Sequence, residues 1–206
     1  MARPRSDISE RILRAAGQRF LRDGVEGASL REIARDARTS VGMVSYYFPT
    51  KDALFAAVVE HAYTGLLNDM AAALSPDVPF EQQVAALHAR LAALSEEEFL
   101  VLRLVIRELM VASPRAGALL ARFSHGHIPL VLNAVAGAYQ RGEVRAEVDP
   151  IAAIMATFIS GVGAQLALRS LASVSPLAEA LPTPARLADA LRDVLFHGLA
   201  PRPGAR

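Results

Sequence analysis

Residues 28–55 constrain the fold more than any other stretch, because two short helices separated by a tight turn can be written on them. The apolar residues of the first helix recur at i, i+3, i+4 and i+7, which places them on one face: Leu30, Ile33, Ala34 and Ala37. Ser29 and Glu32 stand at the spacing of a capping box. The pattern predicts a short helix that begins after Ser29.

The second helix follows Arg38 and Thr39. Ser40 can cap its start, and Pro49 limits its length because proline cannot continue a helix. Its inner face is predicted to hold Val41, Val44 and Phe48, and its outer face Gly42, Met43, Tyr46 and Tyr47, with Ser45 at the boundary. An exposed pair of tyrosines is unusual for a surface that meets only solvent, so we expect a partner there.

Two helices packed across such a turn form a helix-turn-helix, whose second helix can enter the major groove of DNA. The next helix is capped by Thr50, which puts Lys51 in its first turn, where the helix dipole disfavours a cation unless an anion is near. A DNA phosphate would supply that anion. The alternative is that Asp52 offsets Lys51 and that the segment is only a small packing unit.

Residues 29–54 resemble the DNA-binding pattern of the TetR family. The matching residues are Ser29, Ile33, Ala34, Ser40, Gly42, Tyr46, Tyr47, Phe48, Lys51 and Leu54. The sequence departs from the pattern at Arg38, where the family has a turn glycine, and at Ser45, which replaces a frequent aromatic residue. The DNA-binding set that we predict is Ser29, Arg38, Thr39, Ser40, Gly42, Met43, Ser45, Tyr46, Tyr47 and Lys51.

Composition agrees with a soluble DNA-binding protein. The 206 residues are 52% hydrophobic, include no cysteine and carry a net charge of +1. Residues 1–51 hold ten Lys and Arg against six Asp and Glu, while the remainder hold twelve against fifteen, so the basic end is the helix-turn-helix end. The first ten residues lack the apolar core of a signal peptide, and we expect a cytoplasmic protein.

The rest of the chain is predicted to be helical, because runs rich in Ala and Leu are separated by Pro and Gly and nothing alternates as a strand would. The expected helices cover about 7–22, 50–74, 80–94, 95–112, 113–141 with a break at 125–129, 150–172 and 183–199, and the tail from Pro201 is expected to be disordered. The predicted fold is all-α, with a three-helix helix-turn-helix DNA-binding domain at 1–50 and a larger helical regulatory, ligand-binding and dimerisation domain at 51–206.

Residues 151–168 contain no charged side chain, a length that could cross a bilayer. The stretch also holds polar residues and two glycines and has no aromatic belt, so we predict no membrane contact. A helix buried on all sides in a homodimeric four-helix bundle fits better. Small residues that would let the helices approach are Ala153, Ser160, Gly161 and Ala164. An ordinary core helix within one chain is the alternative.

Neither an enzyme nor a bound cofactor is expected, because no catalytic constellation or phosphate-binding loop appears. His125 and His127 are a weak candidate for a metal site, because no third ligand lies nearby in sequence. Arg103 and Arg107 stand four residues apart in an apolar stretch and could form ion pairs, line a ligand cavity or meet the DNA-binding domain. The residues that we predict to contact a ligand are His88, Phe99, Arg103, Arg107, Phe158 and Gln165.

The function that follows from the resemblance is a transcriptional regulator. We expect a homodimer that binds a palindromic operator in double-stranded DNA and is released by a small-molecule effector, as a repressor. An activator with the same fold is the alternative. A purely architectural DNA-binding protein would need more positive charge and no large apolar second domain.

Overall fold

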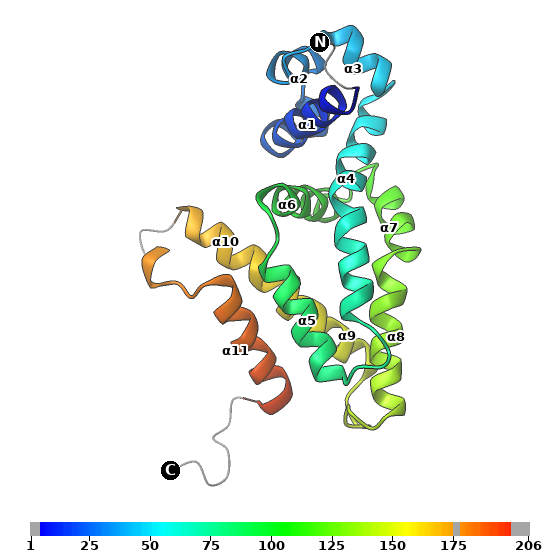
Figure 1. Ribbon diagram of the computed structural model, residues 1–206, viewed down its shortest axis with the longest axis vertical. Helices are drawn as coiled ribbons and strands as arrows, with labels where there is room; N and C mark the ends of the chain where they lie inside the picture. Colours follow the sequence, from blue (N-terminus) through cyan, green and yellow to red (C-terminus); the bar gives the residue numbers. More distant parts are fainter. Residues whose placement is uncertain (1–4, 175–177, 199–206) are drawn as a thin grey trace. The chain divides into compact units, whose positions relative to one another are not determined.

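The computed structural model describes residues 5–174 and 178–198, and the regular elements within these ranges are all helical (Figure 1). This confirms the predicted fold class. The chain forms two compact units, which we call unit 1 (Met1–Leu66 and Ser95–Arg122) and unit 2 (Leu67–Leu94 and Phe123–Arg206). The division differs from the predicted boundary at residue 50, because the segment 95–122 joins the N-terminal helices. The N-terminal residues 1–4 and the tail from Pro201 lie outside the described residues.

Unit 1 is built on the N-terminal helix. Its helices are α1 (Arg5–Gly27), α2 (Leu30–Asp36), α3 (Val41–Tyr47), most of α4 (Lys51–Ala73), α6 (Glu96–Met110) and most of α7 (Ala116–Ser124). Ile12, Ala16 and Phe20 of α1 are fully buried on one face of the helix, and α2, α3 and α4 add Ile33, Val44 and Leu54 to this core. Helices α2 and α3 are therefore anchored to α1 by apolar packing.

The first helix was expected to end near residue 22, but α1 continues to Gly27 with a kink at Gly24. The backbone of Gly24 has φ 76° and ψ 162°, a conformation that suits glycine. A Cβ atom here would lie 2.9 Å from Nη2 of Arg107, so the glycine also lets that guanidinium approach α1. The chain bends at Gly24 and then continues as a short helical segment to Gly27, before α2.

Unit 2 contains α5 (Phe80–Ala92), α8 (His127–Gln140), α9 (Pro150–Phe158), a π-helical segment η1 (Ile159–Gly163), α10 (Ala164–Val174), a short 3-10 turn η2 (Ala178–Ala180) and α11 (Pro184–His197). Asp149 and Thr183 cap α9 and α11 through their side chains, each followed by proline, as the sequence predicts. α7 and α8 are separate helices, and the break expected at 125–129 falls at His125 and Gly126.

The helix from Pro150 to Val174 is long and apolar enough to cross a membrane by length and composition alone, with a mean hydropathy of 1.8. Only 28% of its apolar 18-residue window is buried, so the alternative of an ordinary core helix within one chain is wrong, and burial of this helix in a homodimer stays a prediction. The exposed apolar residues of α9 and η1 are spaced four apart along one face: Ile151, Met155 and Ile159. This face is left uncovered in the single chain.

Candidate nucleic-acid interface

Helix α2 ends in a Schellman motif that turns the chain into α3. The N–H of Arg38 donates to the carbonyl of Arg35 (3.0 Å), and the N–H of Thr39 donates to the carbonyl of Ala34 (2.9 Å). Arg38 has φ 52°, so the position where the family pattern has glycine does adopt a left-handed conformation with an arginine in place. Ser40 caps α3, with Oγ accepting from the N–H of Met43 at 3.2 Å.

The capping box predicted at the start of α2 does not form. Ser29 is the N-cap residue but its side chain makes no cap hydrogen bond. The carboxylate of Glu32 instead lies 3.1 Å from the guanidinium of Arg19 in α1, which also bonds Asp36 at 2.6 Å. This hydrogen bond from Arg19 is the main cause that lowers the pKa of the Asp36 carboxyl. Ion pairing to α1 therefore replaces local capping and fixes α2.

The outward residues of α3 are mostly exposed, as predicted. Tyr46 is 68% exposed, Gly42 and Ser45 are exposed, and Met43 and Tyr47 are half-buried. The rings of Tyr46 and Tyr47 meet edge to face with centroids 5.4 Å apart, so each ring limits the movement of the other. The helix thus offers aromatic and small side chains on one face.

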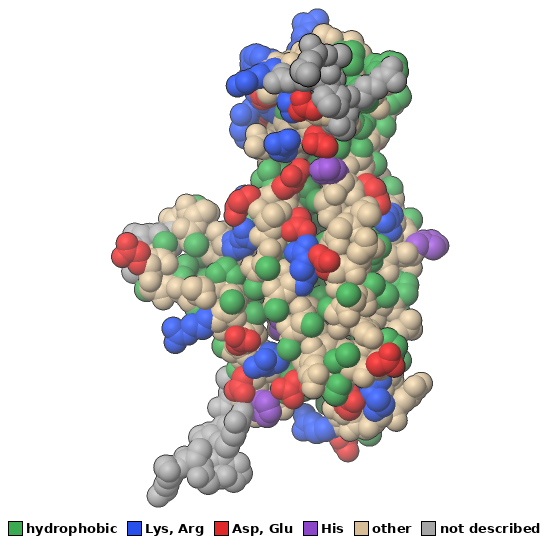
Figure 2. Space-filling view, viewed as in Figure 1, with side chains coloured by type: hydrophobic (Ala, Val, Ile, Leu, Met, Phe, Trp, Pro, Cys, Tyr) green, Lys and Arg blue, Asp and Glu red, His purple; other side chains and the backbone are tan. Residues whose placement is uncertain are grey.

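The inner face of α3 is smaller than predicted. Val44 is fully buried, but Val41 is 38% exposed and Phe48 is half-buried. Positive charge surrounds the helix instead of lying on it, because Arg31, Arg35 and Arg38 are exposed on α2 and the turn. Figure 2 shows Lys and Arg side chains gathered over the part of unit 1 that carries α1 and α2. Such a cluster beside an uncharged helix suits phosphate contacts next to base contacts.

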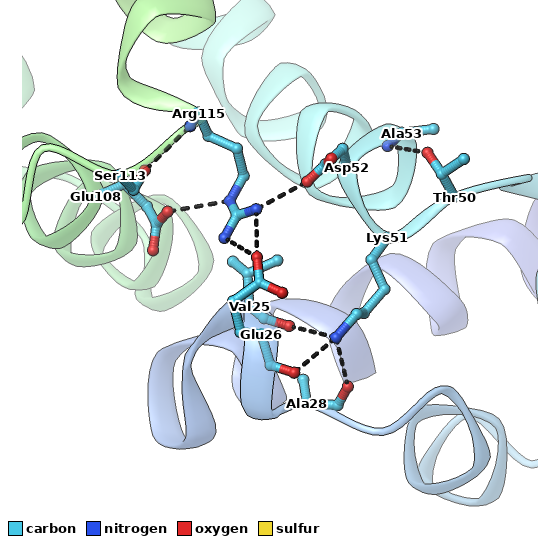
Figure 3. Close-up of polar contacts among 10 residues, drawn as sticks. All are labelled: Val25, Glu26, Ala28, Thr50, Lys51, Asp52, Ala53, Glu108, Ser113 and Arg115. Carbon is cyan, nitrogen blue, oxygen red and sulfur yellow. Dashed lines mark hydrogen bonds and ion pairs between the residues drawn. The ribbon is translucent and has the colours of Figure 1, made fainter.

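Lys51 contacts the end of α1. Its Nζ donates to the backbone carbonyls of Glu26 (2.7 Å), Val25 (3.0 Å) and Ala28 (3.4 Å), as Figure 3 shows. Thr50 caps α4, as predicted, by accepting from the N–H of Ala53 at 3.0 Å. The Lys51 ammonium is thus stabilised by backbone carbonyls, which carry the partial negative charge at the C-terminal end of α1. Its predicted contact with a phosphate stays a prediction, and the structure gives this ammonium a second role.

The six residues predicted to contact a ligand lie in different places. Phe99 and Arg103 line a cleft of about 370 Å³ in unit 1, beside Leu13, Gly17 and Val58. Arg107 donates to the carbonyl of Leu21 in α1 at 2.9 Å. Of the three roles predicted for it, this is the contact with the DNA-binding domain. The other three residues belong to unit 2 and are His88, Phe158 and Gln165.

Two of these unit 2 residues are almost completely buried and hold a polar atom without a partner among the described residues. Nε2 of His88 lies 3.1 Å from the carbonyl of Thr157, while its Nδ1 has no hydrogen bond. The amide of Gln165 donates to the carbonyl of Pro184, while its Oε1 has none. Burial is the main cause that lowers the pKa of His88. Phe158 stacks on His127 with centroids 5.9 Å apart.

Of the four residues predicted to form a dimer interface, Gly161 is buried within the chain and the other three are half-buried. A Cβ atom on Gly161 would lie 2.8 Å from Cδ1 of Leu91 and 3.0 Å from Cδ2 of His88, so Gly161 permits close packing of η1 on α5 inside the chain. Ser160 is half-buried, and its hydroxyl donates to the carbonyl of Ala156. Ala153 and Ala164 are half-buried. Gly161 therefore serves helix packing within one chain, while contact of the three half-buried residues with a second chain stays a prediction.

Sequence reasoning missed Arg115, which lies between α6 and α7 and bonds three carboxylates. Its partners are distant in sequence, so no local pattern pointed to them. His125 and His127 are not joined by a third ligand, since within 5–174 and 178–198 no group of three His, Cys, Asp or Glu residues could hold a metal ion.

Comparison with known proteins supports the DNA-binding assignment. The family described as "Bacterial regulatory proteins, tetR family" matches residues 12–58, which span α1, α2, α3 and the start of α4. The transcriptional repressor NicS of Pseudomonas putida is 34% identical over 74 residues, which are 36% of this chain. The match covers about a third of that relative, 34% of its length.

Solved structures share the fold over nearly the whole chain. A tetR-family regulatory protein from Rhodococcus RHA1 has a TM-score of 0.72 at 19% identity and covers 93% of this chain and 96% of its own. The regulator FadR from Bacillus subtilis, solved in complex with stearoyl-CoA, has a TM-score of 0.68 at 14% identity and covers 93% and 99%. The helix-turn-helix geometry, the family match and the shared fold lead to one assignment. Residues 12–58 therefore form a DNA-binding domain of the type found in the tetR family of bacterial regulatory proteins, and the chain as a whole shares the fold of solved regulators of that family.

Proposed function

We propose that the protein is a repressor that binds a palindromic DNA operator as a homodimer and releases it when a small-molecule effector binds. The exposed, uncharged face of α3 between basic flanks carries this proposal. Met43 and Gly42 contact bases, Tyr46 and Tyr47 contact the DNA backbone, and the arginines of α2 and the turn contact phosphates. A cytoplasmic location follows from a function on DNA.

A randomised duplex pool tests DNA binding without knowledge of the operator. Wild-type protein should enrich a palindromic sequence, and its affinity for that duplex is then measured by fluorescence anisotropy. Met43→Ala should change the preference among related duplexes, because a side chain at a base edge discriminates between base pairs by about 1–3 kcal/mol. An equal loss of affinity for every duplex would show that Met43 does not contact bases.

The dimer is proposed to form on the uncovered face of α9 and η1. Ile151, Met155 and Ile159 are 70%, 48% and 55% exposed, an apolar stripe that water would hydrate in a monomer. The same arrangement in a partner chain would cover the stripe across a two-fold axis, because such an interface is self-complementary. This placement replaces the predicted one through Gly161 and Ser160.

Sedimentation velocity tests the interface with two matched substitutions. Met155→Asp should produce folded monomers, because its side chain is already partly exposed and a charge in a paired apolar interface is costly. Leu132→Asp is the control, since Leu132 is 44% exposed on α8 of the same unit. Dimers that persist in the Met155→Asp variant, or monomers in the control, would contradict the placement.

The effector is proposed to bind in unit 2, where His88 and Gln165 each keep an unpaired buried acceptor. A ligand hydroxyl or amide could donate to such an acceptor, and the neighbouring π-helical segment is a kind of element frequent at functional sites. The B. subtilis FadR structure holds stearoyl-CoA, so a long-chain acyl-CoA is a suitable first probe. If palmitoyl-CoA and stearoyl-CoA both leave the DNA affinity unchanged, saturated long-chain acyl-CoAs are excluded as the effector class.

An activator with the same fold remains the second candidate. Both functions need DNA binding and a dimer, so they differ only in the direction of the transcriptional response. A reporter gene behind the selected duplex separates them, because a repressor lowers reporter expression and an activator raises it.

A further inference from the structure

The helix-turn-helix segment is flanked by two carboxylates that meet at one arginine. Glu26 stands near the end of α1, before α2, and Asp52 stands in the first turn of α4, after α3. Nη1 of Arg115 bonds Oδ1 of Asp52 at 2.8 Å, and both Nη1 and Nη2 bond Oε1 of Glu26 at 2.9 Å (Figure 3). One guanidinium therefore holds both ends of the DNA-reading segment.

The same guanidinium is fixed to α6. Nε of Arg115 bonds Oε2 of Glu108 at 3.1 Å, and the Glu108 side chain is only 5% exposed. The guanidinium also lies 5.7 Å from the ring centre of Phe55 in α4. Because the Arg115 side chain is 10% exposed and bonds three carboxylates, it has little freedom to reach a phosphate. Its position is determined by α6 and the turn that follows.

Two further cations bond the C-terminal part of α1, close to the contact of Arg115 with Glu26. Lys51 bonds the carbonyls at the end of α1, which closes the two flanks of the segment onto each other, and Arg107 of α6 bonds the carbonyl of Leu21 just before the kink at Gly24. The end of α1 is thus held by α4 on one side and by α6 and its turn on the other. All of these contacts lie within unit 1.

We propose that Arg115 is a positioning residue for DNA binding: without touching DNA, it orients the recognition helix α3 by tying both flanks of the helix-turn-helix to the α6–α7 turn. The proposal rests on the proposed function in DNA binding. It adds that the DNA affinity depends on a residue 68 positions after α3 in sequence, and that the carboxylates of Glu26 and Asp52 favour DNA binding despite their charge.

The sign of the carboxylate effect separates this proposal from plain electrostatics. Removing a negative charge near DNA strengthens binding if the charge acts only through its field. If Glu26 and Asp52 act by holding the flanks, Glu26→Gln and Asp52→Asn weaken binding instead. Both side chains are more than 70% exposed, so neither substitution threatens the core. Arg115→Met removes the same tie from the other side.

The experiment measures the affinity of each variant for the duplex selected by the wild-type protein, over a range of salt concentrations. Arg115→Met should weaken binding about tenfold with an unchanged salt slope, because no phosphate contact is lost. Arg122→Met is the matched control, because Arg122 also lies in unit 1 and bonds the carboxylate of Glu60 but contacts neither Glu26 nor Asp52. The DNA affinity of the Arg122→Met variant should change less than threefold.

The carboxylate variants complete the test. Glu26→Gln and Asp52→Asn should each weaken binding about threefold in the wild type and add nothing in the Arg115→Met background, because the tie is already lost. Circular dichroism shows that each variant is folded, and stoichiometric titration with the duplex gives the fraction of each preparation that binds DNA. If Arg115→Met does not fold, the two carboxylate variants and Arg115→Lys, which should lose affinity partly, carry the test.

Three results would overturn the proposal. The first is wild-type affinity in the Arg115→Met variant, the second is a salt slope that falls by about one unit, which would make Arg115 a phosphate contact, and the third is tighter binding by Asp52→Asn. A wild-type protein that selects no duplex would instead refute the proposed function, and this proposal with it.

Discussion

Replacing Arg38 by glycine should stabilise the folded protein while weakening its binding to DNA. Three helices of the chain end in the same Schellman pair of hydrogen bonds, and they differ in the residue at the left-handed position. That residue is Gly142 after α8 (φ 70°), Arg38 after α2 (φ 52°) and Ala112 after α6 (φ 47°). A side chain at two of the three positions therefore costs conformational energy that the third avoids.

The expected magnitude follows from two opposing terms. A non-glycine residue in the left-handed region costs about 1–2 kcal/mol, because Cβ approaches the following carbonyl. Glycine offsets about 0.5–1 kcal/mol of this gain, because it raises the conformational entropy of the unfolded chain. Arg38→Gly should therefore be about 0.5–1 kcal/mol more stable than Arg38→Ala, which keeps the strained backbone and removes only the guanidinium.

Urea unfolding at one fixed protein concentration measures the stability, since the stability of a dimer depends on concentration. Arg38→Ala and Arg38→Gly should lose the same DNA contact, which lowers the salt slope of binding by about 0.9 in both. Ala112→Gly is the matched control, with the same backbone relief and no change of charge. Equal stability of the Arg38→Ala and Arg38→Gly variants would show that the turn is not strained.

Three further predictions follow from the contacts described above. Lys51→Ala should destabilise the protein by about 1.5–3 kcal/mol in urea even without DNA, because the carbonyls at the end of α1 lose a charged donor; unchanged stability would leave phosphate binding as its role. Burial lowers the pKa of the His88 imidazole in the folded protein. As the pH falls, this imidazole is therefore protonated in the unfolded chain before it is protonated in the folded one, and the free energy of unfolding should fall as the pH drops through about 6.5. Urea midpoints from pH 8 to 5.5 should fall less steeply in the His88→Gln variant, and parallel curves would contradict this. An effector that weakens DNA binding must bind less tightly to the DNA complex by the same factor, about 5–150-fold in typical systems, and equal effector affinities with and without the duplex would disprove coupling.

Local patterns in the sequence predicted the helices well. Ser40 and Thr50 cap helices as expected, because capping depends on residues only three positions apart. The left-handed turn at Arg38 was predictable for the same reason. These features require no knowledge of how distant segments pack.

Features that depend on distant partners were not predictable. Glu32 stood at capping distance from Ser29, yet Arg19 of another helix took its carboxylate. Gly161 read as a site of contact between chains, yet it packs on His88. In both cases the residue type was suited to more than one partner, and the tertiary packing determined which partner it contacts.

Lys51, at the start of α4, bonds the end of α1 and is also proposed to contact DNA. Its three N–H groups are already donated to three carbonyls at the end of α1, so a new bond to a DNA phosphate must replace at least one of them. A carbonyl at the end of α1 would then lose its donor when DNA binds. The contacts of Arg115 to Glu26 and Asp52 hold the same two flanks without using Lys51, so they can keep α1 and α4 together while the ammonium turns toward DNA. This division of roles explains why unit 1 places two cations from different elements at one joint.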